Sequence, residues 1–526
     1  MHRYISLLLL APLFAFHACT GEQDKTLEQR ADRISKAEMQ AVAEFLGDDL
    51  LEGRAPGTRG GALAEQYIRS LCKFLDLQPA AGGSYLQLFE MKGFSTGDLS
   101  LNAGGTRLNY IDDIVGTFTA GEGEVILEAP AVFVGFGITA GTWEWDDYKD
   151  TDVKDKIVIT RVNDPGLVNP AIFEGSALTY YGRWTCHIEE ASRRGAAGIL
   201  MIHTDRSAGY DWNVVVNSWT GEELYIHSDL ENDLKFRGWV RESSLVKLLS
   251  ARGISLEELY EASASGEFSP VDLDMPLRIT GKNRSRKVMN HNVIAEIPGK
   301  SEKRIVLSAH IDHLGLAQGN EGDNIYNGAI DNGTAVASMM VAAKILEECR
   351  EELYYTITIL ACNAEESGLL GSRYYVENTD RDNIIANINF ESTPVWDEAG
   401  SIMGIGARFS DFEEIIKGLA KEKDLGYSSF SLSNQGLFYR SDQFSFARYG
   451  IPSVWISAGE DEVSGERNYT EFWGRDYHTV DDEFHEDWEL GGMRQTIQFA
   501  LLLIDHINRS QSPPQMKGDL PFPVVR

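Results

Sequence analysis

The fold of this chain is indicated by one short stretch, Arg304-Ile305-Val306-Leu307-Ser308-Ala309-His310-Ile311-Asp312-His313. A short, mostly apolar run that ends in polar residues is typical of a strand buried on both faces of a sheet. A histidine leaving such a strand can bind a metal through one ring nitrogen, while a carboxylate two residues later holds the other N–H group. Because an isolated His-x-Asp pattern is more often a loop histidine bonded to backbone, its meaning depends on the rest of the chain.

The same pattern continues on both sides of this stretch, from about residue 290 to 510. Continuous apolar strands that alternate with helices predict an α/β domain whose sheet is covered on both faces. The predicted strands are 291–297, 304–309, 355–361, 384–390 and 451–456, and the predicted helices are 335–350, 410–421 and 493–508.

The sequence changes in character between about residues 110 and 275. Short strand-like runs, such as 131–134 and 156–160, are separated there by Gly and by Asp or Asn. A helix-like piece near 188–194 is followed by the apolar run 199–202. The polar and basic stretch 282–287 is predicted to be a linker that leads back into the α/β domain.

Four further motifs lie at the ends of predicted strands or in nearby loops. Taken singly, each has an ordinary explanation, because an Asp before an apolar helix usually caps it and adjacent carboxylates usually stand in a solvated loop. Together with His310 they place two histidines and several carboxylates where an open α/β sheet binds its ligands. The motifs are Gly328-Ala329-Ile330-Asp331-Asn332-Gly333-Thr334, Cys362-Asn363-Ala364-Glu365-Glu366-Ser367-Gly368, Asn387-Ile388-Asn389-Phe390-Glu391 and Tyr477-His478-Thr479-Val480-Asp481-Asp482.

In order and local sequence these motifs resemble the co-catalytic di-zinc aminopeptidase family, which includes secreted bacterial leucine-type aminopeptidases, glutamate carboxypeptidase II and the glutaminyl cyclases. The resemblance implies a mixed, largely parallel sheet sandwiched by helices. It divides the chain into an amino-terminal part of the catalytic domain at 26–112, an inserted, mostly β protease-associated (PA) domain at 113–275 and the main catalytic domain at 285–510. The stretches that carry it outside the motifs are 51–58 and 191–200.

The resemblance also implies a site for two Zn²⁺ ions, or for another divalent metal in their place. Asp331 would bridge the two ions. His310 and Glu391 would complete one site, and Glu366 and His478 would complete the other. The family more often has Asp where this chain has Glu391, so the choice of metal at that site stays open. Independently of the family, imidazole and carboxylate ligands suit Zn²⁺.

Three further residues receive roles in the predicted chemistry. The resemblance implies that Glu365 is the general base and that Asp312 orients His310. A carboxylate that is not a ligand can take a proton from the attacking water and return it to the leaving amine. Tyr477 is either a hydroxyl donor to the developing oxyanion or a packed aromatic ring.

The predicted function is an exported, zinc-dependent exopeptidase that releases amino-terminal residues from peptide substrates. A carboxypeptidase on the same site would need a basic cluster for the substrate's carboxylates, and the sequence offers only Arg440, Arg448 and Arg475 for one. A glutaminyl cyclase is a second alternative. A non-catalytic binding protein on the same scaffold is a third, and it predicts missing metal ligands, whereas every expected ligand is present.

Composition limits the partners of this chain. Its 526 residues include 80 Asp and Glu but only 48 Lys and Arg, so the formal net charge is −32. Such an excess opposes a sequence-independent grip on nucleic acid, which needs clustered Lys and Arg, and it opposes adhesion to an anionic membrane through a basic patch. The sequence does not indicate an oligomeric state.

The amino terminus predicts a location outside the cytoplasm. Residues 1–18 have the positive start, the apolar stretch and the small final residue of a signal peptide. Phe16-His17-Ala18-Cys19 resembles the lipobox of bacterial lipoproteins, so we expect membrane contact only through a lipid anchor at Cys19. The alternative is ordinary cleavage near Ala18. Either outcome predicts a periplasmic or cell-envelope protein.

Overall fold

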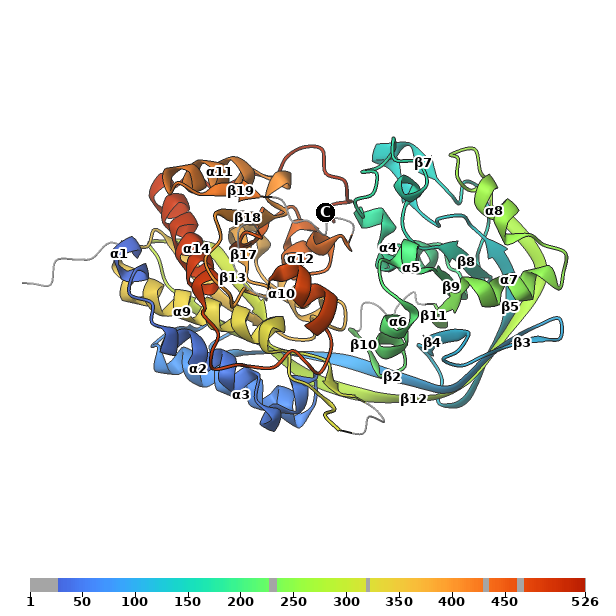
Figure 1. The fold of residues 1–526 in the computed structure, drawn as a ribbon, viewed down its shortest axis with the longest axis horizontal. Coiled ribbons are helices and arrows are strands. Elements are labelled where there is room, and N and C mark those ends of the chain that lie inside the picture. The colour runs from blue at the N-terminus through green and yellow to red at the C-terminus, as the bar shows by residue number, and fades with distance from the viewer. Residues whose placement is uncertain (1–26, 227–233, 318–321, 429–434, 461–467, 526) are drawn as a thin grey trace, which may run out of the picture.

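The computed structural model shows two lobes joined by two long strands (Figure 1). Strands β2 (Leu86–Ala103) and β12 (Val271–Ile297) pair in an antiparallel manner and run along one side of both lobes. We call residues 104–270, at one end of these strands, the inserted lobe. The helices and strands at their other end form the α/β lobe. The structure describes residues 27–226, 234–317, 322–428, 435–460 and 468–525, so the predicted signal segment and Cys19 lie outside the described residues.

The α/β lobe is built on a mixed, largely parallel sheet, which confirms the predicted fold class. Neighbouring strands follow the order β19, β18, β20, β17, β13, β16 and β12. The four central strands are parallel, whereas β12 and β18 run antiparallel to their central neighbours. The bounds are β13 (Ser301–His310), β16 (Tyr355–Cys362), β17 (Ile384–Asn389), β18 (Ser401–Ile405), β19 (Gly426–Ser428) and β20 (Ser453–Ala458).

Helices cover both faces of this sheet, because apolar side chains point alternately to either side of each strand. Leu307 packs into the larger cluster with residues of α9 and α14, whereas Val306 packs on the opposite face with Phe446 of α12 and Val376 of α10. The helices of this lobe are α1 (Leu27–Ala31), α2 (Lys36–Leu46), α3 (Arg59–Phe74), α9 (Ala335–Glu348), α10 (Leu370–Glu377), α11 (Phe412–Glu422), α12 (Gln443–Ala447), α13 (Tyr469–Glu471) and α14 (Gly491–Ser510).

The turn that leads into α3 brings the amino-terminal segment close to the sheet. The side chain of Thr58 caps α3 by accepting the backbone N–H of Gly61 at 3.2 Å. A Cβ atom at Gly60 would lie 1.6 Å from the carbonyl oxygen of Leu51, so only glycine permits this close approach. The turn thereby holds Arg54, whose side chain is 1% exposed, inside the lobe.

The sheet continues through β12 into the inserted lobe, where β5, β8, β9 and β11 are parallel neighbours and β4 lies at the edge. Its strands are β3 (Thr106–Asn109), β4 (Ile114–Phe118), β5 (Gly123–Phe133), β6 (Thr139–Ala140), β7 (Trp145–Asp146), β8 (Ile157–Arg161), β9 (Gly198–His203), β10 (Glu223–Ile226) and β11 (Phe236–Arg241). Its helices are α4 (Trp184–Arg193), α5 (Asp205–Ala208), α6 (Trp212–Trp219), α7 (Glu242–Ser250) and α8 (Leu256–Ala262).

The predicted linker at 282–287 is wrong, because these residues are the middle of β12. Asn283 is buried and donates to the carbonyl oxygens of Ala120 and Gly121, while the basic side chains on either side of it point to solvent. Lys282 pairs with Asp98 at 2.8 Å and Arg286 with Glu222 at 2.6 Å. A strand exposed on one face can therefore carry a polar composition that resembles a loop.

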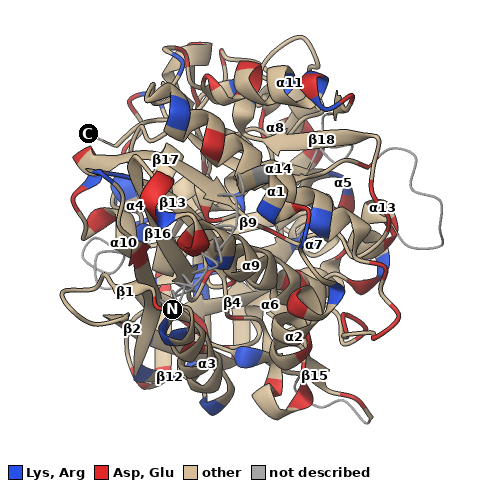
Figure 2. Ribbon diagram, turned by 90° about the vertical axis from the view of Figure 1, so that its left-hand side faces the viewer, with Lys and Arg blue, Asp and Glu red and all other residues tan. Residues whose placement is uncertain are grey.

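The surface of the α/β lobe carries both signs of charge. Figure 2 shows Asp and Glu interspersed with Lys and Arg along its helices and loops. Within the described part of the chain, no helix is both long and apolar enough to cross a membrane.

Candidate metal centre

The predicted site residues lie at one edge of the sheet, where the three neighbouring parallel strands β16, β13 and β17 end. His310 is the last residue of β13, and it pairs in register with Cys362 at the end of β16. On the other side, Ser308 pairs with Asn389 at the end of β17. Because the carboxyl ends of parallel strands lie at the same edge, the loop after β16 brings Glu365 and Glu366 to His310, and the residues after β17 bring Glu391.

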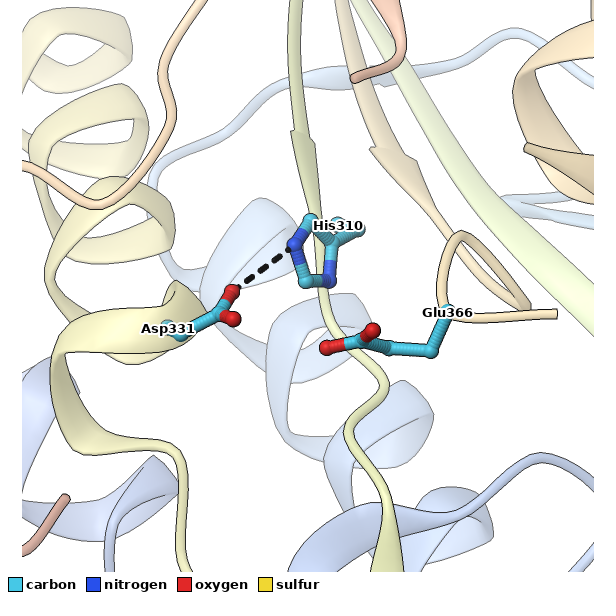
Figure 3. Close-up of side chains that lie close together, drawn as sticks. All are labelled: His310, Asp331 and Glu366. Atoms are coloured by element: carbon cyan, nitrogen blue, oxygen red, sulfur yellow. Dashed lines mark ion pairs between the residues drawn. The ribbon is translucent and has the colours of Figure 1, made fainter. Parts of the chain in front are cut away.

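Asp331 lies between the two predicted histidine ligands. Its Oδ1 is 3.2 Å from Nε2 of His310, and its Oδ2 is 3.3 Å from Nε2 of His478. Asp331 belongs to the irregular turn Ala329–Thr334 that precedes α9, and its side chain is 3% exposed. Figure 3 shows the side chains of His310, Asp331 and Glu366 pointing toward one another from three different segments.

The remaining predicted ligands complete a group around each histidine. Glu391 Oε1 lies 3.1 Å from His310 Nε2, and Glu366 Oε2 lies 3.2 Å from His478 Nε2. Oxygen and nitrogen atoms of His310, Asp331 and Glu366 all lie within 4.8 Å of one another, as do those of His310, Glu365 and Glu391. The structure therefore brings together all five predicted ligands and the predicted base.

The electrostatics of the site are dominated by crowded acidic groups. Burial raises the pKa of Glu391 to about 7 and that of Glu365 well above the ordinary carboxyl value. Burial alone would lower the pKa of His478, but Glu366 and Asp331 outweigh this effect and raise it to about 9. The carboxyl groups that are buried or nearly buried here are those of Asp312, Asp331, Glu365, Glu366, Glu391 and Asp442.

These residues fit divalent cations. Burying so many carboxylates raises the free energy of the folded state unless positive charge compensates them. Nε2 of His478 is buried and makes no hydrogen bond with the described residues, although carboxylate oxygens of Asp331 and Glu366 lie close to it. A cation between the ring nitrogen and these oxygens would satisfy all three atoms. Imidazole and carboxylate donors in this combination suit Zn²⁺.

Asp312 contacts His310 through its backbone carbonyl oxygen, whereas a contact through its carboxylate was expected. Nδ1 of His310 lies 3.1 Å from the backbone carbonyl oxygen of Asp312, and 3.8 Å from its carboxylate. The carboxylate instead accepts the backbone N–H groups of Glu365 and Glu366, at 3.1 and 3.3 Å. Asp312 thus orients the histidine through its main chain and the loop of the predicted base through its side chain.

Two polar side chains that the sequence did not single out support the segments that carry the predicted ligands. Asp482 accepts the backbone N–H groups of Ile330 and Asp331, at 2.8 and 2.9 Å. The guanidinium of Arg54 donates to the carbonyl oxygens of Ile311 and Gly328 at 2.9 and 3.0 Å. Asp482 stands at the end of a quoted motif, and Arg54 stands in the segment 51–58, but neither carries a local pattern that predicts such contacts.

His313 and Tyr477 pack beside the predicted ligands. Nδ1 of His313 lies 2.8 Å from Oε1 of Glu366, so this histidine holds a carboxylate. The ring of Tyr477 stacks on His478 with centroids 3.8 Å apart, and its hydroxyl accepts a hydrogen bond from Arg440 at 3.1 Å. Tyr477 therefore lies directly beside a predicted metal ligand, and its hydroxyl oxygen serves as an acceptor for Arg440.

Known proteins share both the fold and part of the sequence. The structure is similar to an aminopeptidase from Aneurinibacillus sp. strain AM-1, with a TM-score of 0.52, 15% identity and coverage of 95% of this chain and 98% of that one. A probable leucine aminopeptidase 2 of Aspergillus oryzae is 26% identical over 246 residues, which is 44% of this chain and 46% of that protein. A leucine aminopeptidase 1 of Coccidioides posadasii is 28% identical over 193 residues, or 34% of this chain and 48% of that protein.

The chain thus spans about half the length of the curated relatives that it matches. The matched family model is that of peptidase family M28, and it covers the strands that carry the metal centre as well as the helices that flank them. Residues 292–502, which include the strand-end ligands described above, match the model of peptidase family M28.

Proposed function

We propose that this chain is a zinc-dependent aminopeptidase that hydrolyses the amino-terminal bond of peptides outside the cytoplasm. The observation that carries the proposal is the position of Asp331, whose two carboxylate oxygens face two different histidines. The leucine aminopeptidases named above support an aminopeptidase rather than a carboxypeptidase or a glutaminyl cyclase. The presence of every expected ligand argues against a non-catalytic binding protein.

The proposed metal content is two zinc ions. His310, Asp331 and Glu391 would hold one ion, and Asp331, Glu366 and His478 would hold the other. When bound, such a pair of ions supplies an activated water and polarises the carbonyl of the scissile bond.

Glu365 is the proposed general base. Its carboxylate comes within 3.9 Å of His310 Nε2, and its side chain is 9% exposed. Burial raises the pKa of Glu365, which suits a group that must take up and release a proton near neutral pH. Glu365 accepts the proton of the attacking water and then delivers it to the nitrogen of the leaving amine. Asp312 keeps the base in place through the backbone of its loop.

Tyr477 is proposed to stabilise the oxyanion that develops on the scissile carbonyl. Because its hydroxyl oxygen accepts a hydrogen bond from Arg440, the hydroxyl proton can point to the substrate. A positioned donor of this kind stabilises the transition state more than the ground state.

Two further parts of the proposal, the cellular location and the identity of the inserted lobe, rest on the sequence. Residues 1–18 support export, and Cys19 supports a lipid anchor at the cell envelope. The inserted lobe is proposed to be a protease-associated domain, which its sequence at 191–200 resembles.

The proposal is tested with a panel of matched peptides and the purified, zinc-loaded full chain. An aminopeptidase should cleave Leu-Ala-Ala with a free amino terminus and the same peptide with an amidated carboxyl terminus, but not its amino-acetylated form. Cleavage of the acetylated peptide together with resistance of the amidated one would instead identify a carboxypeptidase. Release of ammonia from an amino-terminal glutamine peptide, without hydrolysis of the panel, would identify a cyclase.

A further inference from the structure

Side chains hold every backbone N–H group of the loop 363–366, which follows β16 and carries the proposed base. Asn292 accepts the N–H of Asn363 through Oδ1 at 3.1 Å, and Oδ1 of Asn363 accepts the N–H of Ala364 at 2.9 Å. The carboxylate of Asp312 accepts the remaining two, at 3.1 and 3.3 Å. The backbone that leads into the base is therefore fixed by three side chains, and Asn363 is the one that belongs to the loop itself.

Ala364 lies between Asn363 and the proposed base in a left-handed backbone conformation. Its φ is 57°, and its side chain is buried. This conformation is unfavourable for a residue with a Cβ atom, so it persists only where the surroundings determine it. The contact between Asn363 and the N–H of Ala364 supplies part of that support. We therefore expect the direction in which the chain enters Glu365 to depend on how the Asn363 side chain is held.

Glu65 of α3 holds the side chain of Asn363. Its Oε1 accepts a hydrogen bond from Nδ2 of Asn363 at 3.0 Å, and both residues are buried. The same amide nitrogen lies 3.1 Å from Oδ1 of Asn290 and 3.3 Å from the carbonyl oxygen of His291. Of these three acceptors, only Glu65 is a carboxylate, and hydrogen bonds to an ionised partner are roughly twice as strong as neutral ones. Glu65 is therefore the strongest of the three partners of this amide.

The carboxylate of Glu65 is itself held in place by β12. Its Oε1 accepts the backbone N–H of His291 at 3.2 Å, and its Oε2 lies 2.9 Å from Nδ1 of the same residue. Burial raises the pKa of Glu65, and the contacts with His291 and Asn363 oppose this effect by favouring the carboxylate. Helix α3 contacts β12, and β12 pairs with β16, after which the loop begins. One buried carboxylate thus connects a helix of the amino-terminal segment, a strand and the loop of the base.

We propose that Glu65 is a positioning residue for the proposed base: it holds Asn363, and Asn363 sets the backbone from which Glu365 reaches the metal centre. This inference rests on the proposed function, in which Glu365 is the general base. Asp312 holds the N–H of Glu365 itself, whereas Glu65 acts two residues earlier, so two buried carboxylates hold the loop at different points. A general base must lie within hydrogen-bond reach of the proton that it takes, so a small displacement of its backbone lowers the rate.

Three variants of Glu65 separate its contact with Asn363 from its charge. The zinc-loaded full chain is assayed for kcat and KM on Leu-Ala-amide, and bound zinc is measured on the same sample. Glu65→Ala should lower kcat about tenfold while KM and zinc content stay at the wild-type level. Glu65→Asp keeps the charge but withdraws the carboxylate from Asn363, so it should show a similar loss. Glu65→Gln keeps the length and an acceptor oxygen, so it should retain most of the wild-type kcat.

A double-mutant cycle with Asn363 tests whether Glu65 acts through this residue. Asn363→Ala should lower kcat by at least as large a factor as Glu65→Ala. Adding Glu65→Ala to Asn363→Ala should cause no further loss of kcat, because the contact between the two side chains is already absent. The matched control is Glu44→Ala, the same substitution at an exposed position of α2. The control should keep the wild-type kcat.

The possible outcomes separate this inference from the proposed function. Equal kcat values for Glu65→Asp and Glu65→Gln would overturn the positioning role and leave the aminopeptidase intact, and this comparison holds even if Glu65→Ala does not fold. Losses that multiply in the double variant, or a loss of kcat matched by a loss of zinc, would also overturn it. Failure of the zinc-loaded wild-type chain to hydrolyse Leu-Ala-amide would instead overturn the proposed function itself.

Discussion

The carboxylate of Asp312 accepts the backbone N–H of Glu365 at 3.1 Å, so a residue that follows one strand positions the loop that follows its neighbour. The same carboxylate reaches the N–H of Glu366 at 3.3 Å. A single buried side chain therefore sets the backbone of both the proposed base and a proposed metal ligand. His310 depends on Asp312 in a different way, through the backbone carbonyl oxygen.

Asp312→Asn is expected to lower kcat by about tenfold to a hundredfold, as is usual for residues that support a metal site. The amide can present one oxygen but not two, so one of the two loop N–H groups loses its partner. Steady-state kinetics on Leu-Ala-amide and zinc analysis of the same sample measure the effect. Asp424→Asn, at an exposed position in the turn after α11, is the matched control, and equal kcat values for the two variants would contradict the role of Asp312.

Glu365→Gln is expected to lower kcat by about a hundredfold or more while the zinc content stays at the wild-type level. General base catalysis accounts for factors of this size, and the substitution removes the proton acceptor without removing a proposed ligand. Turnover and bound zinc are measured on the same purified protein. Retention of most of the wild-type kcat would show that another group takes the proton.

Asp331→Ala is expected to lower the zinc content from about two ions per chain to one or none. Its two carboxylate oxygens face His310 and His478, so both proposed sites lose a ligand at once. By contrast, Glu391→Ala removes a ligand from one site only and should leave about one ion. Zinc per chain is measured by elemental analysis after dialysis. Equal losses in the two variants would contradict a bridging position for Asp331.

A buried acid of the inserted lobe predicts a pH dependence of stability. Asp147 is 1% exposed, and burial raises its pKa from 3.8 to about 7. The folded state therefore holds a proton that the unfolded state releases between these values. The resulting contribution to the free energy of unfolding is fully present below about pH 4, and it is lost as the pH rises to 7 and above.

Asp147→Asn should remove this contribution, which is on the order of 4 kcal/mol at most. Between pH 5 and pH 8 the urea midpoint of the variant should fall less than that of the wild type. Asp155→Asn, an exposed position in the same lobe, should follow the wild type. If the Asp147 variant and the wild type lose stability in parallel, the proton is not held by Asp147.

Local pattern was sufficient to predict the strands and helices that form the α/β sheet. The apolar runs at 304–309, 355–361 and 384–390 are the central strands β13, β16 and β17, because a strand buried on both faces must be apolar at nearly every position. The same reasoning failed at 282–287, where one face of β12 is exposed and basic side chains pair with acids on neighbouring segments.

The candidate ligands were predictable because each stands at the end of such a strand or in a short motif. The residues that hydrogen-bond to the segments carrying these ligands could not be predicted. Asp482 lies 151 residues from the backbone N–H of Asp331 that it accepts, and the carboxylate of Asp312 reaches a loop 53 residues away. No periodicity in the sequence records contacts between segments so far apart.

The same distinction applies to the surroundings of Arg440. From the sequence, Arg440 was one of three basic residues that a carboxypeptidase could use to bind its substrate's carboxylates. In the structure it donates to the hydroxyl of Tyr477, whose ring stacks on His478. The identity and order of elements follow from local hydrophobic pattern, whereas the meeting of charged side chains depends on how the elements pack, and packing is a property of the whole chain.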